Sequence, residues 1–129
     1  MDNENISLTD SEWQVMECLW ERSPKTGREL TDELEERMGW NRSTTLTFLR
    51  RLEAKGAVEC GDGERVRTFS PLISRENAAL SEAESLLERA YKGSLGLLVS
   101  SLTRKQRLSK GEIEELYRLL EEMEAKNDD

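Results

Sequence analysis

The sequence predicts a mostly α-helical protein with one small β-hairpin: a winged helix-turn-helix head at residues 1–73 and a helical dimerisation region at residues 74–129. Three observations predict this fold class. Capping signals open three successive amphipathic segments, strand-like alternation then surrounds a Gly/Asp turn, and helical periodicity resumes from residue 74 onward. Three short helices followed by a hairpin form the element order of a winged helix-turn-helix.

Two capping boxes mark the first two helices. In such a box a Thr hydroxyl and the Glu side chain three residues later satisfy each other's backbone amides, and the pairs Thr9/Glu12 and Thr26/Glu29 both fit it. The first helix is expected over residues 10–21. The apolar residues at helical spacing are Trp13, Met16, Leu19 and Trp20 in the first helix, and Leu30, Leu34 and Met38 in the second, which Gly39 ends.

A third helix is predicted over residues 41–55, where Asn41 can cap its start and Gly56 can end it. At about 100° per residue, one face collects apolar residues and the opposite face is poor in acids. The inward set is Thr45, Phe48, Leu49 and Leu52, the outward set is Ser43, Thr47, Arg50 and Ala54, and Leu46 and Arg51 lie on the flanks. The position of this helix in the element order makes it the recognition helix.

The hairpin is predicted from two short strands, residues 57–60 and 65–69, around a Gly/Asp turn at residues 61–64. Pro71 ends the second strand, and a residue or two near Lys25 is also strand-like. Because the hairpin follows the third helix directly, it occupies the position of the wing.

Beyond residue 74 the chain carries three apolar stripes at helical spacing, the last of them opened by a capping box at Ser109 and Glu112. Helices this short cannot bury such stripes alone, so they must pack on another chain or on the head. A homodimer is the simplest solution. The residues expected to make the dimer contact are Leu87, Tyr91, Leu95, Leu98, Leu102, Ile113, Leu116, Tyr117 and Leu120.

Composition argues against several classes of protein. The chain has no His, and Cys18 and Cys60 form no CxxC pair, so we expect no catalytic residue, no metal site and no cofactor. No apolar run reaches the roughly 18 residues that a membrane span needs, and no signal-peptide pattern opens the chain. We therefore expect no membrane insertion and a cytoplasmic location.

The net charge of −8 argues against indiscriminate binding of polyanions, but the charge is unevenly distributed. Residues 41–69 hold six Lys or Arg, Lys55 among them, and four Asp or Glu, which gives this segment a charge of +2. The positive charge thus lies on the third helix and the hairpin, where phosphates would lie. The candidate DNA contacts are Arg42, Ser43, Leu46, Thr47, Arg50, Arg51, Arg65 and Arg67.

Two functions remain open from these patterns. In a DNA-binding head, arginines would contact guanine or phosphate, and the methyl groups of Thr47 and Leu46 would meet a thymine methyl. In a protein-interaction adaptor that binds no DNA, the same side chains would form an ordinary solvated face, with Arg65 and Arg67 in weak surface ion pairs. A salt-sensitive, specific complex with double-stranded DNA distinguishes the two.

Several stretches are also typical of a known family. They are Ile6-Ser7, Glu12-Trp13, Val15-Met16, Leu19-Trp20, Glu29-Leu30, Trp40, Thr44, Thr47, Leu49, Arg51-Leu52, Lys55-Gly56, Arg65, Pro71-Leu72, Gly93-Ser94-Leu95 and Leu108-Ser109-Lys110. With them the chain resembles, over nearly its whole length, the penicillinase and methicillin-resistance repressors and their copper-responsive relatives. This resemblance implies a homodimeric winged-helix repressor that binds a palindromic operator.

The resemblance also implies roles for individual residues. Family contacts to DNA carry over to Thr44, Thr47, Arg51 and Arg65, whereas Ser43 stands where relatives often have Lys and Leu46 replaces a polar or basic residue. The operator is therefore expected to differ from those of known members.

The same resemblance implies two ways in which repression could be relieved. Antibiotic-responsive members are cleaved between Asn and Phe by a membrane sensor protease, and the pair aligned with that site is Ser101-Leu102. The cysteine pairs of copper-responsive members are absent from this tail, so copper sensing is not expected.

Overall fold

The computed structural model describes residues 6–62, 65–105 and 107–127. Its contacts divide the chain into two compact units, Met1–Ser85 and Leu86–Asp129. The division falls inside helix α4 (Arg75–Tyr91), whereas the predicted domain boundary between residues 73 and 74 lies between the last strand and this helix.

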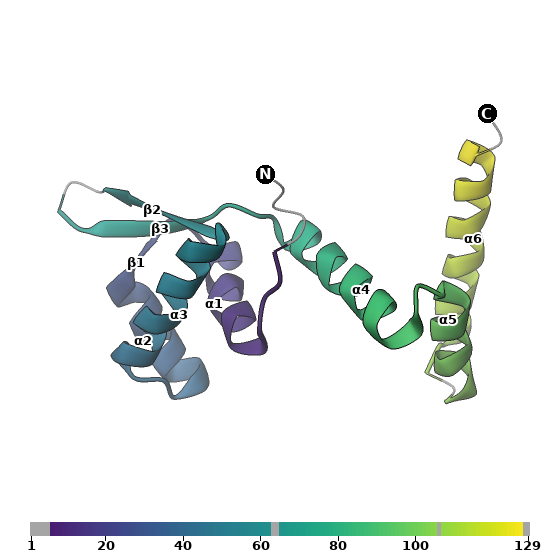
Figure 1. The fold of residues 1–129 in the computed structure, drawn as a ribbon, viewed down its shortest axis with the longest axis horizontal. Coiled ribbons are helices and arrows are strands. Elements are labelled where there is room, and N and C mark those ends of the chain that lie inside the picture. The colour runs from purple at the N-terminus through teal and green to yellow at the C-terminus, as the bar shows by residue number, and fades with distance from the viewer. Residues whose placement is uncertain (1–5, 63–64, 106, 128–129) are drawn as a thin grey trace. The chain divides into compact units, whose positions relative to one another are not determined.

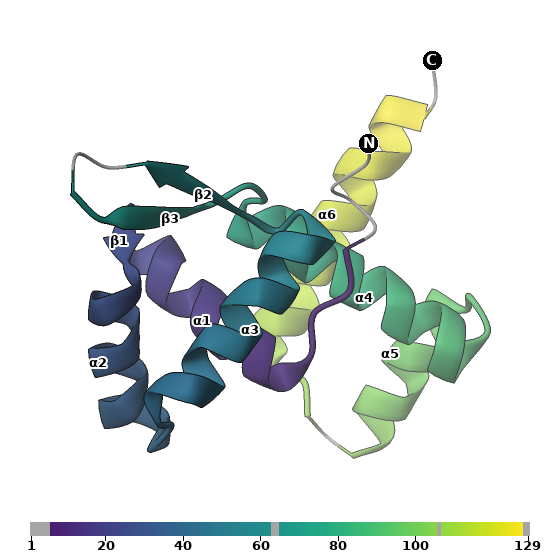
Figure 2. The ribbon, with the colours of Figure 1, turned by 60° about the vertical axis from the view of Figure 1, so that its left-hand side comes forward.

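The first unit is a winged helix-turn-helix, as predicted, and Figures 1 and 2 show its hairpin extending beyond the three helices. Three helices and three strands of one antiparallel sheet precede α4 in the described chain. In order they are α1 (Asp10–Glu21), β1 (Lys25–Thr26), α2 (Gly27–Met38), α3 (Arg42–Lys55), β2 (Val58–Asp62) and β3 (Arg67–Pro71).

The caps predicted from the sequence fix where these helices begin and end. Both capping boxes are formed, by Thr9 with Glu12 and by Thr26 with Glu29. At the start of α3, Asn41 Oδ1 accepts a hydrogen bond from the backbone amide of Thr44 at 2.9 Å. Helices α2 and α3 both end at glycines with positive φ, a conformation that side chains with a Cβ rarely adopt.

The three-stranded sheet has the order β1-β3-β2, and Phe69 of β3 pairs with Lys25 on one side and Cys60 on the other. The strand-like residues predicted near Lys25 are therefore confirmed as β1. The hairpin strands, however, lie one to two residues later than predicted. Ala57 still belongs to the helix end, because its amide donates to Leu52 O at 2.9 Å. The predicted turn residues Gly63 and Glu64 lie outside the described residues.

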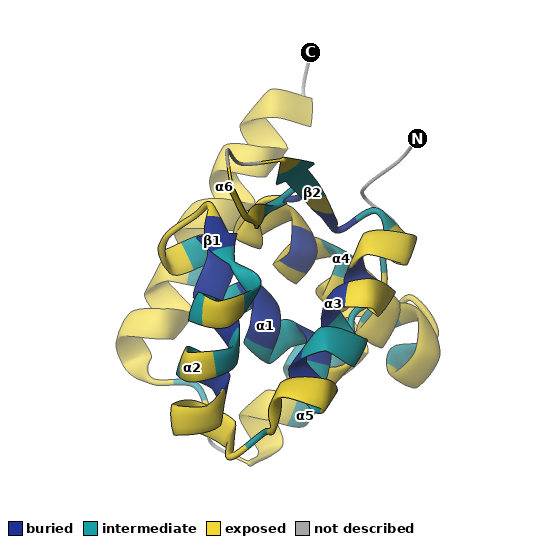
Figure 3. Cartoon of the chain, turned by 90° about the vertical axis from the view of Figure 1, so that its left-hand side faces the viewer, coloured by how far each residue is buried: buried dark blue, intermediate teal, exposed yellow. Residues whose placement is uncertain are grey.

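The core of the head lies between α1, α2, α3 and the sheet. Figure 3 shows the buried residues of the helices facing inward. Trp13 and Trp20 meet edge to face with centroids 5.3 Å apart, and Trp20 Nε1 donates to Ile73 O at 2.9 Å. The largest fully buried apolar side chains are Met16, Leu19, Leu30, Leu34, Leu49 and Leu52.

The second unit contains the last turns of α4, then α5 (Leu95–Arg104) and α6 (Lys110–Asn127). Ser94 caps α5, and the predicted box of Ser109 with Glu112 opens α6. None of the described residues between 86 and 127 is buried. Among the helices the structure describes, none is both long enough and apolar enough to cross a membrane.

Candidate nucleic-acid interface

Helix α3 turns the predicted face outward. Thr45, Leu49 and Leu52 are buried, whereas Ser43 and Arg50 are exposed on the opposite side. Arg42 and Leu46 fall on the flank that borders the hairpin, and Arg51 falls on the other flank. This arrangement confirms the helical phase that the sequence predicted.

The hydroxyl groups on this face are already partly engaged. Thr47 Oγ1 donates to Ser43 O at 2.9 Å, so the hydroxyl proton of Thr47 is used inside the helix. Its methyl group and its oxygen lone pairs remain for an external partner. Thr44 is half-buried beside the Asn41 cap, and Leu46 packs partly against the core.

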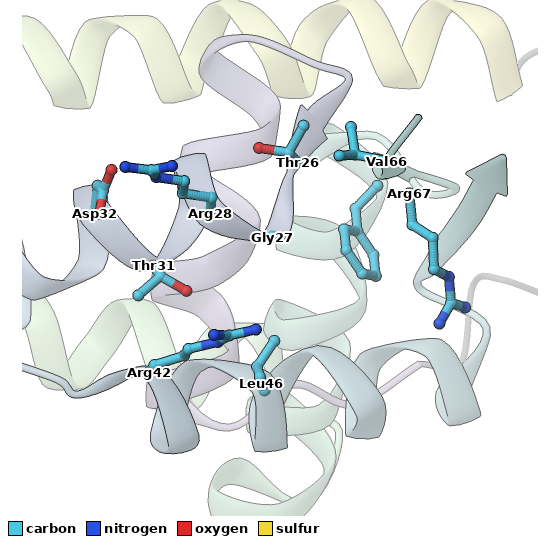
Figure 4. A pocket seen from close by; sticks show the side chains of 10 residues that line it. Thr26, Gly27, Arg28, Thr31, Asp32, Arg42, Leu46, Val66 and Arg67 are labelled. Carbon is cyan, nitrogen blue, oxygen red and sulfur yellow. The ribbon is translucent and has the colours of Figure 1, made fainter. Parts of the chain in front are cut away.

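A groove of about 770 Å³ lies between α2, α3 and the hairpin (Figure 4). In that view Arg42 extends along α3 towards Leu46, and Arg67 extends from β3 towards α3. Arg28, from the first turn of α2, lines the same groove. The other lining residues are Thr26, Gly27, Thr31, Asp32, Val66 and Phe69.

Arg28 is the functional candidate that the sequence analysis missed. The sequence did carry a signal, because Arg28 follows a Thr-Gly cap and stands in the first turn of a helix, where positive charge is unfavourable. Arg42 occupies the same kind of position in α3, whose first turn holds no acidic residue. The helix dipole disfavours both arginines at these positions, although Glu29 offsets the charge of Arg28 in the first turn of α2.

Ion pairing separates the cations of the head into two groups. Within the described chain, six of them pair with a carboxylate, and five make no such pair. The paired cations are Arg22, Lys25, Arg37, Lys55, Arg67 and Arg75; the others are Arg28, Arg42, Arg50, Arg51 and Arg65. We call the second group, together with Arg67, the arginine surface. All of its members come from α2, α3 or the hairpin region.

Lys55 does not belong to the arginine surface. The sequence counted Lys55 among the positive charges available to DNA in residues 41–69, and the structure corrects this. Its Nζ donates to Glu12 Oε1 at 2.5 Å and to Ser7 O at 2.7 Å. Burial alone would raise the pKa of the Glu12 carboxyl, but hydrogen bonds from Lys55 and Thr9 outweigh it and lower that pKa. Lys55 therefore holds the N-terminal segment and α1 against α3.

The two hairpin arginines differ from each other. The sequence places both arginines on one side of the predicted strand 65–69, but Arg65 is exposed and precedes β3, so only Arg67 lies in a strand. Arg67 Nη2 lies 3.9 Å from Glu53 Oε2 of α3, in an exposed ion pair. This contact is the weak pairing with nearby acids that the sequence left open for Arg67.

The predicted dimer residues lie in helices that give their apolar side chains little cover within the second unit itself. Leu87, Tyr91, Leu98 and Leu116 are half-buried, and Leu95, Leu102, Ile113, Tyr117 and Leu120 are exposed. The candidate cleavage pair, Ser101-Leu102, lies inside α5. There Ser101 Oγ donates to Leu97 O at 3.0 Å.

The chain matches a known family model along most of its length. The model described as "Penicillinase repressor" covers residues 8–122. A penicillinase repressor from Bacillus licheniformis is 34% identical over 115 residues, which span 89% of this chain and 90% of that protein. The methicillin resistance regulatory protein MecI of Mammaliicoccus sciuri is 26% identical over 120 residues, or 93% of this chain and 98% of that protein.

A solved structure matches the fold at a comparable identity. It is the solution structure of the monomeric form of Bacillus licheniformis BlaI in complex with the blaP half-operator. The superposition has a TM-score of 0.51 and 31% sequence identity, and it covers 55% of this chain and 87% of that chain.

Proposed function

Since the chain belongs to the penicillinase repressor family, we propose that it is a transcriptional repressor that binds double-stranded operator DNA as a homodimer. Helix α3 enters the major groove, and the hairpin contacts flanking phosphates. The protein performs no chemistry, and it represses by occupying the promoter. The solved relative bound to a half-operator supports this role for the head.

The observation that carries this proposal is the arginine surface. An anionic protein must keep some positive charge unneutralised in order to hold phosphates, and among the residues that the structure describes five arginines on this side of the head pair with no carboxylate. Repulsion from the acidic remainder is screened over about 8 Å at physiological salt. Contacts at the arginine surface therefore outweigh the net charge of −8.

Dimerisation is proposed for the second unit, because its apolar side chains are left uncovered by a single chain. Tyr117 is 68% exposed and Leu120 is 54% exposed, on the same stripe of α6. A two-fold dimer would space two heads for half-sites one helical turn, roughly 34–36 Å, apart. The operator is then palindromic, and each head contributes to a bivalent complex.

Relief of repression is proposed to follow cleavage between Ser101 and Leu102 by a membrane sensor protease. Both residues are helical, so α5 must unwind locally before a protease can bind the chain in an extended form. Cleavage there separates α6 from the head. The bivalent complex is thereby reduced to two independent heads.

A gel shift tests the proposed function. Purified protein and the DNA upstream of its own gene are expected to form a specific complex that weakens steeply as salt is raised, because each arginine–phosphate contact displaces counterions. A complete absence of a salt-sensitive specific complex would favour the protein-interaction adaptor.

Arg28→Ala is expected to weaken binding to the operator and to unrelated DNA alike, and to reduce the salt slope by about one unit. Because Arg28 opposes the helix dipole, this variant should be at least as stable as the parent, so unfolding does not explain a loss. Arg37→Ala is the matched control: it removes one Arg from the same helix, but one that pairs with Glu21 on α1. An equal slope change in both variants would contradict the assignment.

Glu53→Gln is expected to strengthen DNA binding by about fivefold. The substitution releases Arg67 from its ion pair and removes a carboxylate from the DNA-facing side of α3. Glu59→Gln removes the same charge from an exposed position of β2 that makes no ion pair within the described residues, so it controls for net charge. Equal gains in the two variants would mean that Arg67 makes no specific contribution.

A further inference from the structure

We propose that Phe48, supported by Trp40, positions the Arg51 guanidinium for operator recognition. This inference rests on the proposed function and deepens it, because it names what orients a side chain at the reading surface. The helical spacing in the sequence predicts only that Phe48 lies on the inward face of the helix.

The three side chains form a stack at one flank of α3. The rings of Trp40 and Phe48 have centroids 4.9 Å apart and an interplanar angle of 36°. Arg51 Cζ lies 5.4 Å from the centroid of the Phe48 ring, within the range of a cation–π contact. Phe48 and Trp40 pack against the hydrophobic core, whereas Arg51 is exposed. The ring is thus held by the core and supports an exposed cation.

This kind of contact leaves the Arg51 hydrogen-bond donors free. A guanidinium held by a carboxylate donates N–H groups to that partner, as Arg75 does to Glu17 Oε1 and Oε2, and those groups cannot then bind DNA. An aromatic face attracts the charge without accepting those N–H groups in a fixed fork. Arg51, which makes no ion pair among the described residues, can therefore present its donors to guanine or phosphate.

The contact with the ring preorganises the Arg51 side chain for binding DNA. A free Arg side chain loses much conformational entropy when a ligand fixes it, and part of that loss has already occurred when the side chain rests on a ring. Arg51 also lies one helical turn after Thr47, so the two side chains neighbour each other on the reading face. Phe48 is a positioning residue: it acts on DNA binding through Arg51.

A double-mutant cycle tests the coupling, using the duplex that the protein selects from a randomised pool. Phe48→Leu, which keeps an apolar side chain but removes the ring face, is expected to weaken binding about two- to fivefold. In an Arg51→Ala background the same substitution should change nothing, and Phe48→Tyr should behave like the parent. Equal losses in both backgrounds would show a packing effect, and no loss, or tighter binding, in the single variant would also overturn the proposal.

A second measurement needs no DNA. In the NMR spectrum of the free protein, the Arg51 Nε–H signal should carry a ring-current shift and restricted motion, both of which disappear in Phe48→Leu. A mobile, unshifted signal in the parent would refute positioning whatever the protein binds. Failure of the proposed function would look different, because no specific duplex would be selected while the Arg51 signal kept its shift.

Discussion

Leu120→Glu is expected to break the proposed dimer into monomers and to lower apparent affinity for a two-half-site operator by about 10²–10⁴-fold. Leu120 is 54% exposed within a single chain, so a charge there is tolerated by the monomer and becomes buried only at an interface. Losing the interface removes bivalence without altering any base contact. Analytical ultracentrifugation and operator titration measure the two effects on the same preparation.

Ala125→Glu is the matched control for this substitution. It adds the same charge to the same helix on the side away from the apolar stripe, and it should leave both the dimer and its affinity unchanged. Binding to a single half-site should be equal in all three proteins. A Leu120→Glu protein that remains dimeric would exclude this stripe from the interface.

Glu12→Ala is expected to destabilise the head by about 3 kcal/mol, the magnitude found when one partner of a buried ion pair is removed. Glu12 is 1% exposed, and its carboxylate accepts hydrogen bonds from Lys55 Nζ and from the amide of Thr9. Alanine removes the acceptor of the Thr9 amide, leaves Lys55 Nζ only Ser7 O, and breaks the ion pair between α1 and α3. Urea denaturation at neutral pH measures the loss.

Glu29→Ala tests whether burial accounts for that effect. Glu29 completes the equivalent capping box of α2, but its ion-pair partner is Arg22 and both side chains are largely exposed, so a loss of only about 1 kcal/mol is expected. Equal losses in the two variants would mean that the Lys55 contact adds little.

The lowered pKa of Glu12 also gives a pH dependence. Because its pKa in the folded protein lies below the ordinary value of 4.5, its stabilisation is fully present above that value and is lost as pH falls through the lowered pKa. The stability of the parent should thus decline in acid more than that of Glu12→Ala. Parallel curves for the two proteins between pH 6 and pH 3 would contradict this assignment.

Local signals were sufficient to predict most of the head. The Thr9 and Thr26 boxes, the Asn41 cap and the glycines after α2 and α3 act within a few residues, so the sequence reveals them directly. The outward face of α3 followed from the same short-range geometry, because an α-helix has a fixed angle per residue.

Contacts between segments that are distant in the sequence could not be predicted from these local patterns. Lys55 looked like part of a basic surface, but it reaches Glu12, 43 residues away in the sequence. Arg28 joins the groove only because the turn between α2 and α3 and the sheet bring three elements together. The bounds of the hairpin strands were missed by a residue or two because the amide of Ala57 still takes part in the C-terminal cap of α3.

The charge distribution shows why net charge alone was a poor guide to function. Acidic residues on α1 and α2 hold Arg37, Arg75 and Lys25 in ion pairs, so these cations, none of which belongs to the arginine surface, are neutralised locally. Five members of the arginine surface make no ion pair among the described residues, so this face keeps much of its positive charge. A protein with a net charge of −8 can in this way present a basic face.

Selection of bound duplexes from a randomised DNA pool tests the central claim most directly, because it presumes no operator. Bivalent recognition by two copies of α3 predicts enrichment of an inverted repeat whose half-sites are centred about one helical turn apart. The Arg51→Ala protein should enrich it more weakly than the parent does. A pool that stays random after repeated rounds with the parent protein would contradict the claim that this surface reads DNA.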